Sequence, residues 1–342
     1  MLDHTTFELA KNTCQIVCAT ASFVINSLLI FLIITKSTKN MGHYRYLMIF
    51  FCCCSLFFSA LDMFIRPIMH SYRTSFFILI DLRNREMSLR VGELLVSMMA
   101  GVFGVVIYGI AIHFIYRYFA LERNERTRFF DTKYLPLWFS IPVLGGVSWT
   151  SVSFFILPMN PEFSEYMRTD IEKRFAVDPD QIAYIGVMFF VPQPDGSVAF
   201  NWKAASGFLL YMLIMIVPWT IVIYIGAESR KKIKELPASL YGRNLQMQLF
   251  KALVAQTLIP VVMLFLPFSF IFTLPFFEID CSALTNFQTF VYALYPAIDS
   301  LPSFLFIESY RNTVTGFLTC RRQNAVQHYA ASADDTVREE QT

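Results

Sequence analysis

The chain has 342 residues, of which 55% are hydrophobic and only 16% are charged, and its net charge is +2. Soluble domains carry about a quarter charged residues, and disordered chains are poor in aromatic residues, whereas this chain contains 36 phenylalanines. The composition therefore excludes a disordered or low-complexity chain. It leaves an unusually large soluble core or an integral membrane protein.

Seven apolar runs have the length of about 20 residues that a helix needs to cross a bilayer. They are Cys14–Ile34, Tyr46–Ile65, Val91–Phe114, Leu135–Leu157, Ala204–Ile225, Ala252–Phe277 and Leu284–Ile307. We therefore expect an all-α membrane protein, a seven-transmembrane helix bundle within residues 1–320. The segments on the side of the tail carry 18 of the 28 lysines and arginines. Because basic residues favour the cytoplasm, we expect the N-terminus outside.

The second long outer segment, Pro158–Lys203, carries seven acidic residues. Pro161–Phe175 is typical of a short amphipathic helix. Ala183–Val191 and Ser197–Trp202 are typical of two strands, and the sequence Pro-Asp-Gly at 194–196 supplies turn chemistry between them. We expect an extracellular β-hairpin, which either covers a ligand site as a lid or simply shields the loops.

The inner segments are basic, and two interpretations of Lys231 and Lys232 stay open: a topology determinant beside anionic lipid, or a docking surface for an acidic partner. A short helix at about 309–320 is expected along the inner leaflet. Cys320, beside two arginines, is a candidate for palmitoylation. Residues 321–342 are polar, and we expect a disordered cytoplasmic tail.

Ionisable residues inside the apolar runs are costly and often functional. Asp62 precedes Arg66 by four residues, which favours a local ion pair over a ligand role. Glu93 opens the third run, where it is either solvated or placed at a helix N-terminus. Asp299 lies deep in the seventh run without a local base, which favours a switch contact.

Small and polar residues of the third run share one helical face, which indicates close packing at the centre of the bundle. They are Glu93, Ser97, Gly101, Gly104, Tyr108 and Ala111. His113 and Arg117 share the opposite face. Prolines in the later runs, such as Pro260, Pro267 and Pro296, give places where a helix can bend.

The sequence lacks the common motifs of metal sites, phosphate-binding loops and catalytic nucleophiles. It has no His/Cys or carboxylate pair at metal spacing, no Gly-rich phosphate loop and no nucleophile elbow. The seven cysteines lack a second outer partner for Cys281, which argues against a disulfide framework. We expect no enzyme activity, no cofactor, no metal and no nucleic-acid partner.

Five motifs, in order and in register from about Lys39 to Arg311, resemble those of the nematode serpentine chemoreceptors of class r (Str). They are MGHYRYLM at Met41–Met48, RPIMH at Arg66–His70, HFIYRYFA at His113–Ala120, QLFKALVAQTLIP at Gln248–Pro260, and YPAID at Tyr295–Asp299 followed by Tyr310 and Arg311. The chain departs from the usual pattern at Ser300, where proline is common.

The resemblance implies a G-protein-coupled receptor for small environmental chemicals, in the plasma membrane of chemosensory cilia. Arg117, flanked by Tyr116 and Tyr118, would then be the cationic group that faces a heterotrimeric G protein. Pro296 and Asp299 would form the hinge of the seventh helix. The chain lacks the Cys pair that joins the third helix to the outer loop in rhodopsin-like receptors.

We expect the ligand, an odorant or soluble chemical, to bind between helices three, five, six and seven beneath the hairpin. The candidate lining residues are Met98, Met99, Tyr211, Phe268, Phe270 and Tyr292, and an apolar pocket with few polar groups suits a small ligand. The sixth helix would move about Pro260 and Pro267. Three alternatives stay open: a ligand-gated seven-span channel, a transporter, and a receptor whose acidic loop attracts a cationic peptide.

Overall fold

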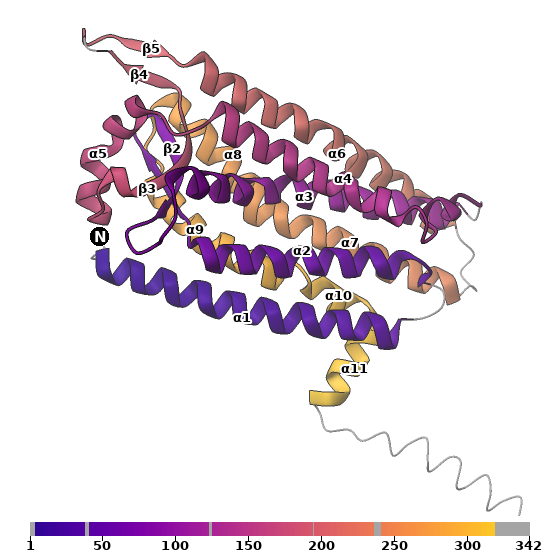
Figure 1. Ribbon diagram of the computed structural model, residues 1–342. Helices are drawn as coiled ribbons and strands as arrows, with labels where there is room; N and C mark the ends of the chain where they lie inside the picture. Colours follow the sequence, from indigo (N-terminus) through magenta and orange to yellow (C-terminus); the bar gives the residue numbers. More distant parts are fainter. Residues whose placement is uncertain (1–3, 38–40, 123–124, 194, 236–240, 319–342) are drawn as a thin grey trace, which may run out of the picture.

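Long helices lie side by side in an elongated bundle, and a small sheet with one short helix closes one end (Figure 1). The computed structural model describes residues 4–37, 41–122, 125–193, 195–235 and 241–318. We call the closed end the sheet end and the other the Arg117 end. Cys320 and the expected tail 321–342 lie outside the described residues.

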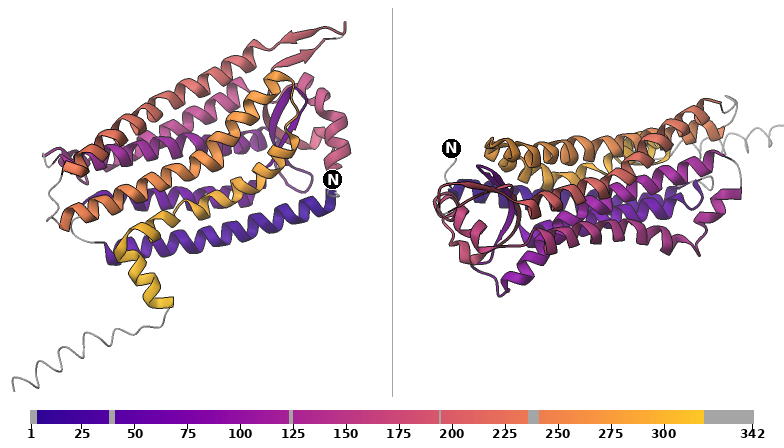
Figure 2. Two further views of the ribbon diagram at one scale, coloured as in Figure 1. Left: turned by 180° about the vertical axis from the view of Figure 1, so that it is seen from behind. Right: turned by 90° about the horizontal axis from the view of Figure 1, so that it is seen from above.

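The helical segments follow the apolar runs of the sequence but extend beyond them. They are α1 (His4–Lys36), α2 (Tyr44–Ile65), α3 (Leu89–Leu121), α4 (Leu135–Ser151), α6 (Trp202–Glu235), α7 (Tyr241–Pro260), α8 (Leu266–Thr273), α9 (Ser282–Ile298), α10 (Leu301–Phe306) and α11 (Glu308–Leu318). Within the described residues, six helices have the length and composition to cross a membrane, and a seventh segment, residues 282–306, is followed by α11 at a bend of 98°. Figure 2 shows α11 leaving the bundle at the Arg117 end.

Two spans contain a wider helical turn. The fourth continues from α4 into the π-helix η3 (Val152–Ile156), and the sixth runs from α7 through the π-helix η5 (Val261–Phe265) into α8 and the 3-10 turn η6 (Leu274–Phe277). Such π-helical turns occur mostly as single insertions in α-helices, often at functional sites. A further 3-10 turn, η2 (Glu125–Phe130), precedes α4.

Helix α3 is the most buried of the spans and packs closely on α4. The approach depends on glycine, because a Cβ atom on Gly104 would lie 2.3 Å from the carbonyl oxygen of Gly145, and one on Gly146 would lie 2.5 Å from a methyl of Val105. Helix α6, in contrast, exposes apolar side chains such as Leu213 and Ile223 to its surroundings. The central position expected for the third span is therefore confirmed, and the outer surface is apolar, as lipid contact requires.

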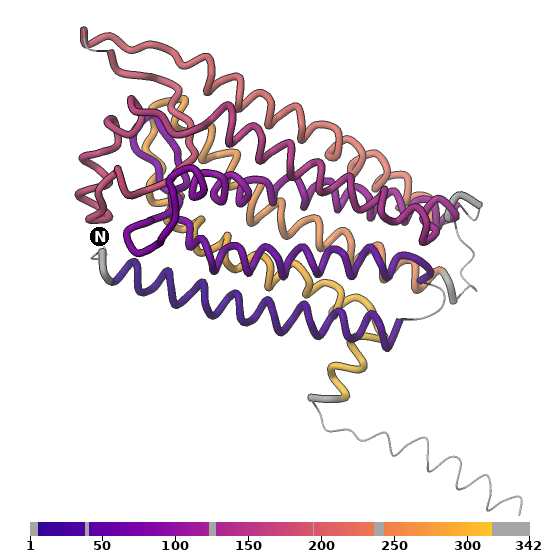
Figure 3. The backbone as a smooth tube through the Cα atoms, in the orientation of Figure 1, coloured from indigo at the N-terminus to yellow at the C-terminus, as the bar shows by residue number. Residues whose placement is uncertain are grey.

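The sheet at the sheet end combines strands from two loops. Strands β1 (Ile68–Tyr72), β2 (Ser75–Asp81) and β3 (Ile182–Met188) form an antiparallel sheet in that order, with Ile68 opposite Leu79 and Phe76 opposite Val187. A separate hairpin joins β4 (Phe190–Pro192) to β5 (Val198–Phe200). The tube drawing follows the chain from α2 through β1 and β2 into α3 (Figure 3).

The predicted pairing of Ala183–Val191 with Ser197–Trp202 is therefore correct only at its turn end. Most of the first segment forms β3, which pairs with β2 instead. The apolar run Phe76–Ile80 lies in β2, whose residues from Ser75 to Ile80 are all buried. A strand in that position needs a hydrogen-bonding neighbour on both edges, and β1 and β3 provide them.

Helix α5 (Pro161–Phe175) covers the sheet, with the bounds that the sequence predicts. The side chain of Asn160 accepts a hydrogen bond from the backbone N–H of Phe163 at 2.7 Å, which caps the helix. Its apolar residues, among them Phe163 and Met167, pack on Phe77 and Tyr184 of the strands. A short 3-10 turn, η4 (Pro179–Gln181), leads from α5 into β3.

Candidate functional site

An apolar cavity of about 380 Å³ lies beneath β2 and β3, between α3, the fourth span, α6 and the sixth span. Aromatic rings form much of its wall: Phe76, Phe103, Trp149, Phe208, Tyr211, Trp219, Phe265, Phe268 and Phe272. The roof comes from the two strands, through Phe76, Ile78, Ile185 and Val187. Strands from two different loops thus form one side of the cavity.

Contacts between rings hold the wall in place. Trp149 stacks on Tyr211 with ring centroids 4.2 Å apart, and Phe103 meets Phe268 edge-on at 4.7 Å. The hydroxyls of Tyr211 and Ser153 are 2.7 Å apart and share a hydrogen bond. The hydroxyl of Ser269 donates to the carbonyl of Phe265 on its own helix. Because these hydroxyls already have partners, the cavity suits a molecule held mainly by apolar contact.

Two of the six residues predicted to line the ligand site, Tyr211 and Phe268, line this cavity. Tyr292 stands behind Phe268, with ring centroids 6.2 Å apart, and donates a hydrogen bond to the carbonyl of Met99 at 2.7 Å. Both Tyr292 and Met99 are buried in the core.

The other two lie elsewhere. Met98 faces a second apolar groove between α2, α3 and α4. Phe270 is 58% exposed on the outer surface of α8 and does not line the cavity.

The surroundings of the cavity also differ from the expected ones. The fourth span contributes Trp149 and Leu157, whereas no residue of α9 or α10 lines this cavity. The predicted contribution of the seventh span to the ligand site stays a prediction. The strands β2 and β3, rather than the hairpin, form the cover. Sequence reasoning missed Phe76 and Trp149, although the short run Phe76–Ile80, too short to span a membrane, was a signal for a buried strand.

At the Arg117 end, the guanidinium of Arg117 is buried, with only 2% of the residue exposed. It lies over the ring of Tyr44, 3.6 Å from the centroid, and donates a hydrogen bond to the side-chain oxygen of Gln246 at 3.1 Å. The hydroxyl of Tyr44 in turn lies 3.3 Å from Nδ1 of His113. Residues of α2 and α7 therefore cover the guanidinium of Arg117. Its Nε and one terminal nitrogen have no hydrogen-bond partner among the described residues.

The neighbours of Arg117 face different ways. Tyr116 is buried, and its hydroxyl donates to the carbonyl of Met41. Tyr118 lies under the ammonium of Lys232, which is 4.0 Å from the ring centroid and 2.5 Å from a carboxylate oxygen of Glu122. Lys231 is exposed and pairs with Glu228 at 2.6 Å. The structure therefore brings Tyr118 and Lys232 together and leaves Lys231 on the surface.

The seventh span breaks at Asp299 and Ser300, between α9 and α10. Asn26 of α1 bridges the break, since its side-chain nitrogen donates to the carbonyl of Pro296 at 3.0 Å and its oxygen accepts from Ser300 at 2.5 Å. Asp299 is fully buried, and neither carboxylate oxygen has a hydrogen-bond partner among the described residues. Tyr295 is near enough to interact with Asp299 electrostatically, but not in hydrogen-bonding geometry.

Pro260 and Pro267 flank the π-helix η5 in the sixth span. Proline removes a backbone donor and disturbs the regular helix, and the wider turn lies between these two positions. The two prolines therefore mark the ends of an irregular segment that also carries Phe265 of the cavity wall.

Two acidic residues have contacts other than those that the sequence predicts. Asp62 forms no ion pair with Arg66; it is buried, and the charge that acts on it is that of Lys11 on α1. Glu93 is neither solvated nor a helix-terminus residue. It is buried, accepts a hydrogen bond from Arg90 at 2.7 Å, and accepts another from the backbone N–H of Met159 at 2.8 Å. It therefore ties α3 to the segment before α5.

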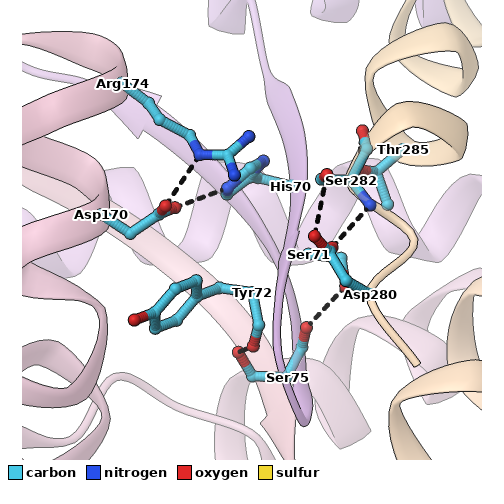
Figure 4. Close-up of polar contacts among 9 residues, drawn as sticks. All are labelled: His70, Ser71, Tyr72, Ser75, Asp170, Arg174, Asp280, Ser282 and Thr285. Atoms are coloured by element: carbon cyan, nitrogen blue, oxygen red, sulfur yellow. Dashed lines mark hydrogen bonds and ion pairs between the residues drawn. The ribbon is translucent and has the colours of Figure 1, made fainter. Parts of the chain in front are cut away.

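A polar cluster connects α5 to the sheet (Figure 4). Asp170 accepts hydrogen bonds from Arg174 and from Nε2 of His70 of β1, each at 2.7 Å. Burial opposes ionisation of Asp170, but the hydrogen bonds and charges of His70 and Arg174 outweigh it and hold its pKa below the usual value. Within the described part of the chain, no three His, Cys, Asp or Glu side chains gather as metal ligands.

Comparison with known proteins decides the family. Residues 11–315 match the family described as serpentine type 7TM GPCR chemoreceptor Str. The chain is 33% identical to serpentine receptor class r-10 of Caenorhabditis briggsae over 321 residues, which cover 92% of both chains, and equally similar to the protein of that name in Caenorhabditis elegans. It is 26% identical to the G-protein coupled receptor str-33 of Caenorhabditis elegans over 314 residues, 90% of both chains.

The chain belongs to the Str family of serpentine chemoreceptors. This confirms the resemblance inferred from the five sequence motifs and the seven-transmembrane fold class. Str proteins form a receptor family rather than an enzyme family, and membership makes this chain a multi-pass membrane receptor with a chemosensory role.

Proposed function

We propose that this Str receptor binds a small, uncharged and largely apolar chemical in the cavity beneath β2 and β3, and that binding activates a heterotrimeric G protein at the Arg117 end. The sheet end and the N-terminus then face outside, and the receptor acts in the plasma membrane of the sensory cilium. The observation that carries the proposal is the cavity of about 380 Å³ with its aromatic wall.

The charge of the outer loop favours a small molecule over a cationic peptide. Arg168 lies within 4.0 Å of four acidic side chains, those of Glu165, Glu172, Asp178 and Asp180. A fifth, Asp170, is paired with His70 and Arg174. Five of the seven acidic residues thus contact a basic side chain, which weakens the field that would attract a cation, although four of them share the single charge of Arg168.

The contacts of Arg117 suggest how a ligand signal reaches the G protein. Gln246, which accepts the hydrogen bond of Arg117, lies on α7, and the same span carries Phe265 and Phe268 in the cavity wall. A ligand that shifts the sixth span about Pro260 and Pro267 therefore releases Arg117 from Gln246. Ligand binding would shift the population towards this state, with Pro296 and Asp299 as a second hinge and Lys231 and Lys232 on the docking surface.

The test is a panel of small neutral chemicals on cells that express the chain, with calcium or cAMP measured with and without co-expressed G protein. We expect a response that needs the G protein and disappears in Arg117→Ala at unchanged surface expression. Arg45→Ala, which removes an exposed arginine at the same end, should respond normally.

Intact output in Arg117→Ala would contradict the assignment of Arg117. A ligand-evoked current that persists without any G protein would identify the chain as a channel and overturn the proposal.

A further inference from the structure

A charged cavity of about 660 Å³ lies at the sheet end between the first turns of α1, the last turn of α2 and the loop that connects β2 to α3. Unlike the aromatic cavity, it has a largely charged wall. Lys11, Arg66, Arg83 and Arg85 contribute cations, and Glu8, Asp81 and Glu86 contribute carboxylates. It shares no lining residue with the aromatic cavity.

Lys11 is the buried cation of this wall. Only 4% of the residue is exposed, and among the described residues no carboxylate forms an ion pair with its ammonium within 4.0 Å. At longer range its charge interacts with Glu8 most strongly, and then with Asp81 and Asp62. One helical turn deeper, both side-chain polar atoms of Gln15 are buried without a partner. Buried charges are normally paired, so a wall with an unpaired ammonium is prepared for an anion.

Glu8 and Asp81 of the wall act on Lys11 only at a distance, without an ion pair within 4.0 Å. Arg83 binds Asp81 through several hydrogen bonds, the shortest of them 2.7 Å, so the main partner of Asp81 is Arg83 rather than Lys11. Arg85 donates to the backbone carbonyls of Phe64 and Ile65, which are neutral acceptors. Arg66 is exposed at the end of α2. Three cations without a short carboxylate contact thus face the same space.

We propose that this cavity binds a small organic anion, whose carboxylate is held by Lys11 with Arg66 and Arg85 as further donors. Ammonium and guanidinium groups form strong charge-assisted hydrogen bonds with carboxylates. The site is separate from the apolar ligand cavity, and the proposal depends neither on that ligand nor on G-protein coupling.

The experiment is calorimetric titration of the purified full-length receptor in a neutral detergent with succinate. We expect saturable binding that weakens in high salt, and no binding of succinamide, its uncharged analogue of similar shape. Lys11→Met should weaken the binding of succinate about tenfold or more, as expected when a charged hydrogen bond is lost. Lys36→Met, which removes an exposed lysine at the other end of α1, should bind as the wild type does.

A second variant guards against misfolding of the first. Arg66→Gln alters an exposed side chain, so the fold should be kept, and it should also weaken the binding of succinate. The proposal is overturned if the wild type does not bind succinate, if succinamide binds equally well, or if both variants bind normally. Binding of short-chain phosphatidic acid but not of succinate would identify a lipid-headgroup site and would equally overturn it.

Discussion

The contact between His70 and Asp170 is made by residues 100 positions apart in the sequence. Asp170 lies on α5 and His70 on β1, so this hydrogen bond fixes the helix to the sheet above the aromatic cavity. Both side chains are almost fully buried, and Arg174 supplies the third member of the cluster. A buried carboxylate is stable only while such partners satisfy it.

We therefore expect Asp170→Asn to lower the stability of the folded receptor by about 1.5–3 kcal/mol, the range for hydrogen bonds to charged groups. The apparent Tm of the purified protein at neutral pH measures this effect. Glu162→Gln, an exposed change on the same helix, should leave the apparent Tm unchanged. Equal values for Asp170→Asn and the wild type would show that the cluster does not hold α5 in place.

The lowered pKa of Asp170 also predicts a dependence on pH. The unfolded chain protonates this carboxyl near its usual pKa of about 3.9, whereas the folded protein does so at a lower pH. The stabilisation by Asp170 is therefore fully present above about pH 4 and is lost as the pH falls through the folded pKa. The difference in apparent Tm between wild type and Asp170→Asn should shrink on acidification below pH about 4. A constant difference would contradict the assignment.

At the scale of elements, the packing of α3 on α4 depends on two pairs of glycines. The stripe of small residues in the sequence predicted close packing, and Gly101, Gly104, Gly145 and Gly146 are where it occurs. A Cβ atom on Gly104 would meet backbone atoms of Gly145, which cannot rotate out of the way as the end of a side chain could. The two helices would have to move apart.

Gly104→Ala should therefore destabilise the receptor by about 1–3 kcal/mol, as overpacking in a core does, although alanine is the better helix former. The apparent Tm should fall. Gly316→Ala in α11, where an added Cβ meets nothing within 4 Å, is the control and should be neutral or slightly stabilising. An unchanged apparent Tm in Gly104→Ala would mean that α4 can shift at little cost.

Local sequence signals were sufficient to predict the bounds of some elements but not the pairing of others. Helix α5 has the predicted bounds because Asn160, Pro161 and the apolar spacing are all local signals. The pairing of β3 was missed because its partner β2 lies about 100 residues earlier, and register between distant strands is set by burial rather than by turn residues.

At the scale of the whole molecule, the cavity exists because four spans and two strands of different loops converge. Phe268 and Phe270 are only two residues apart on α8, yet only one of them lines the cavity. Phe268 lines the cavity, whereas Phe270 points to the outer surface. A helix turns about 100° per residue, so positions two apart face different sides.

Phe268→Trp should therefore fill part of the cavity and lower the response to any agonist at least about tenfold, the effect of losing roughly 1.4 kcal/mol of binding free energy. Concentration–response curves measure this in the cell assay. Phe270→Trp, the same change on the outer face, is the matched control and should leave the curve unchanged. Equal shifts in both variants would place the ligand elsewhere.

The lengths of the apolar runs and a set of short motifs were sufficient to predict the membrane class, the seven spans and the family. Tertiary structure alone decided which residues meet. It placed Tyr211 and Phe268 in one cavity and Phe270 outside it, it covered Arg117 with Tyr44 and Gln246, and it left Lys11 of α1 facing the charged cavity. The reason is physical: a run of apolar residues fixes that a helix enters the membrane, but only packing against its neighbours fixes its rotation and therefore the direction of each side chain.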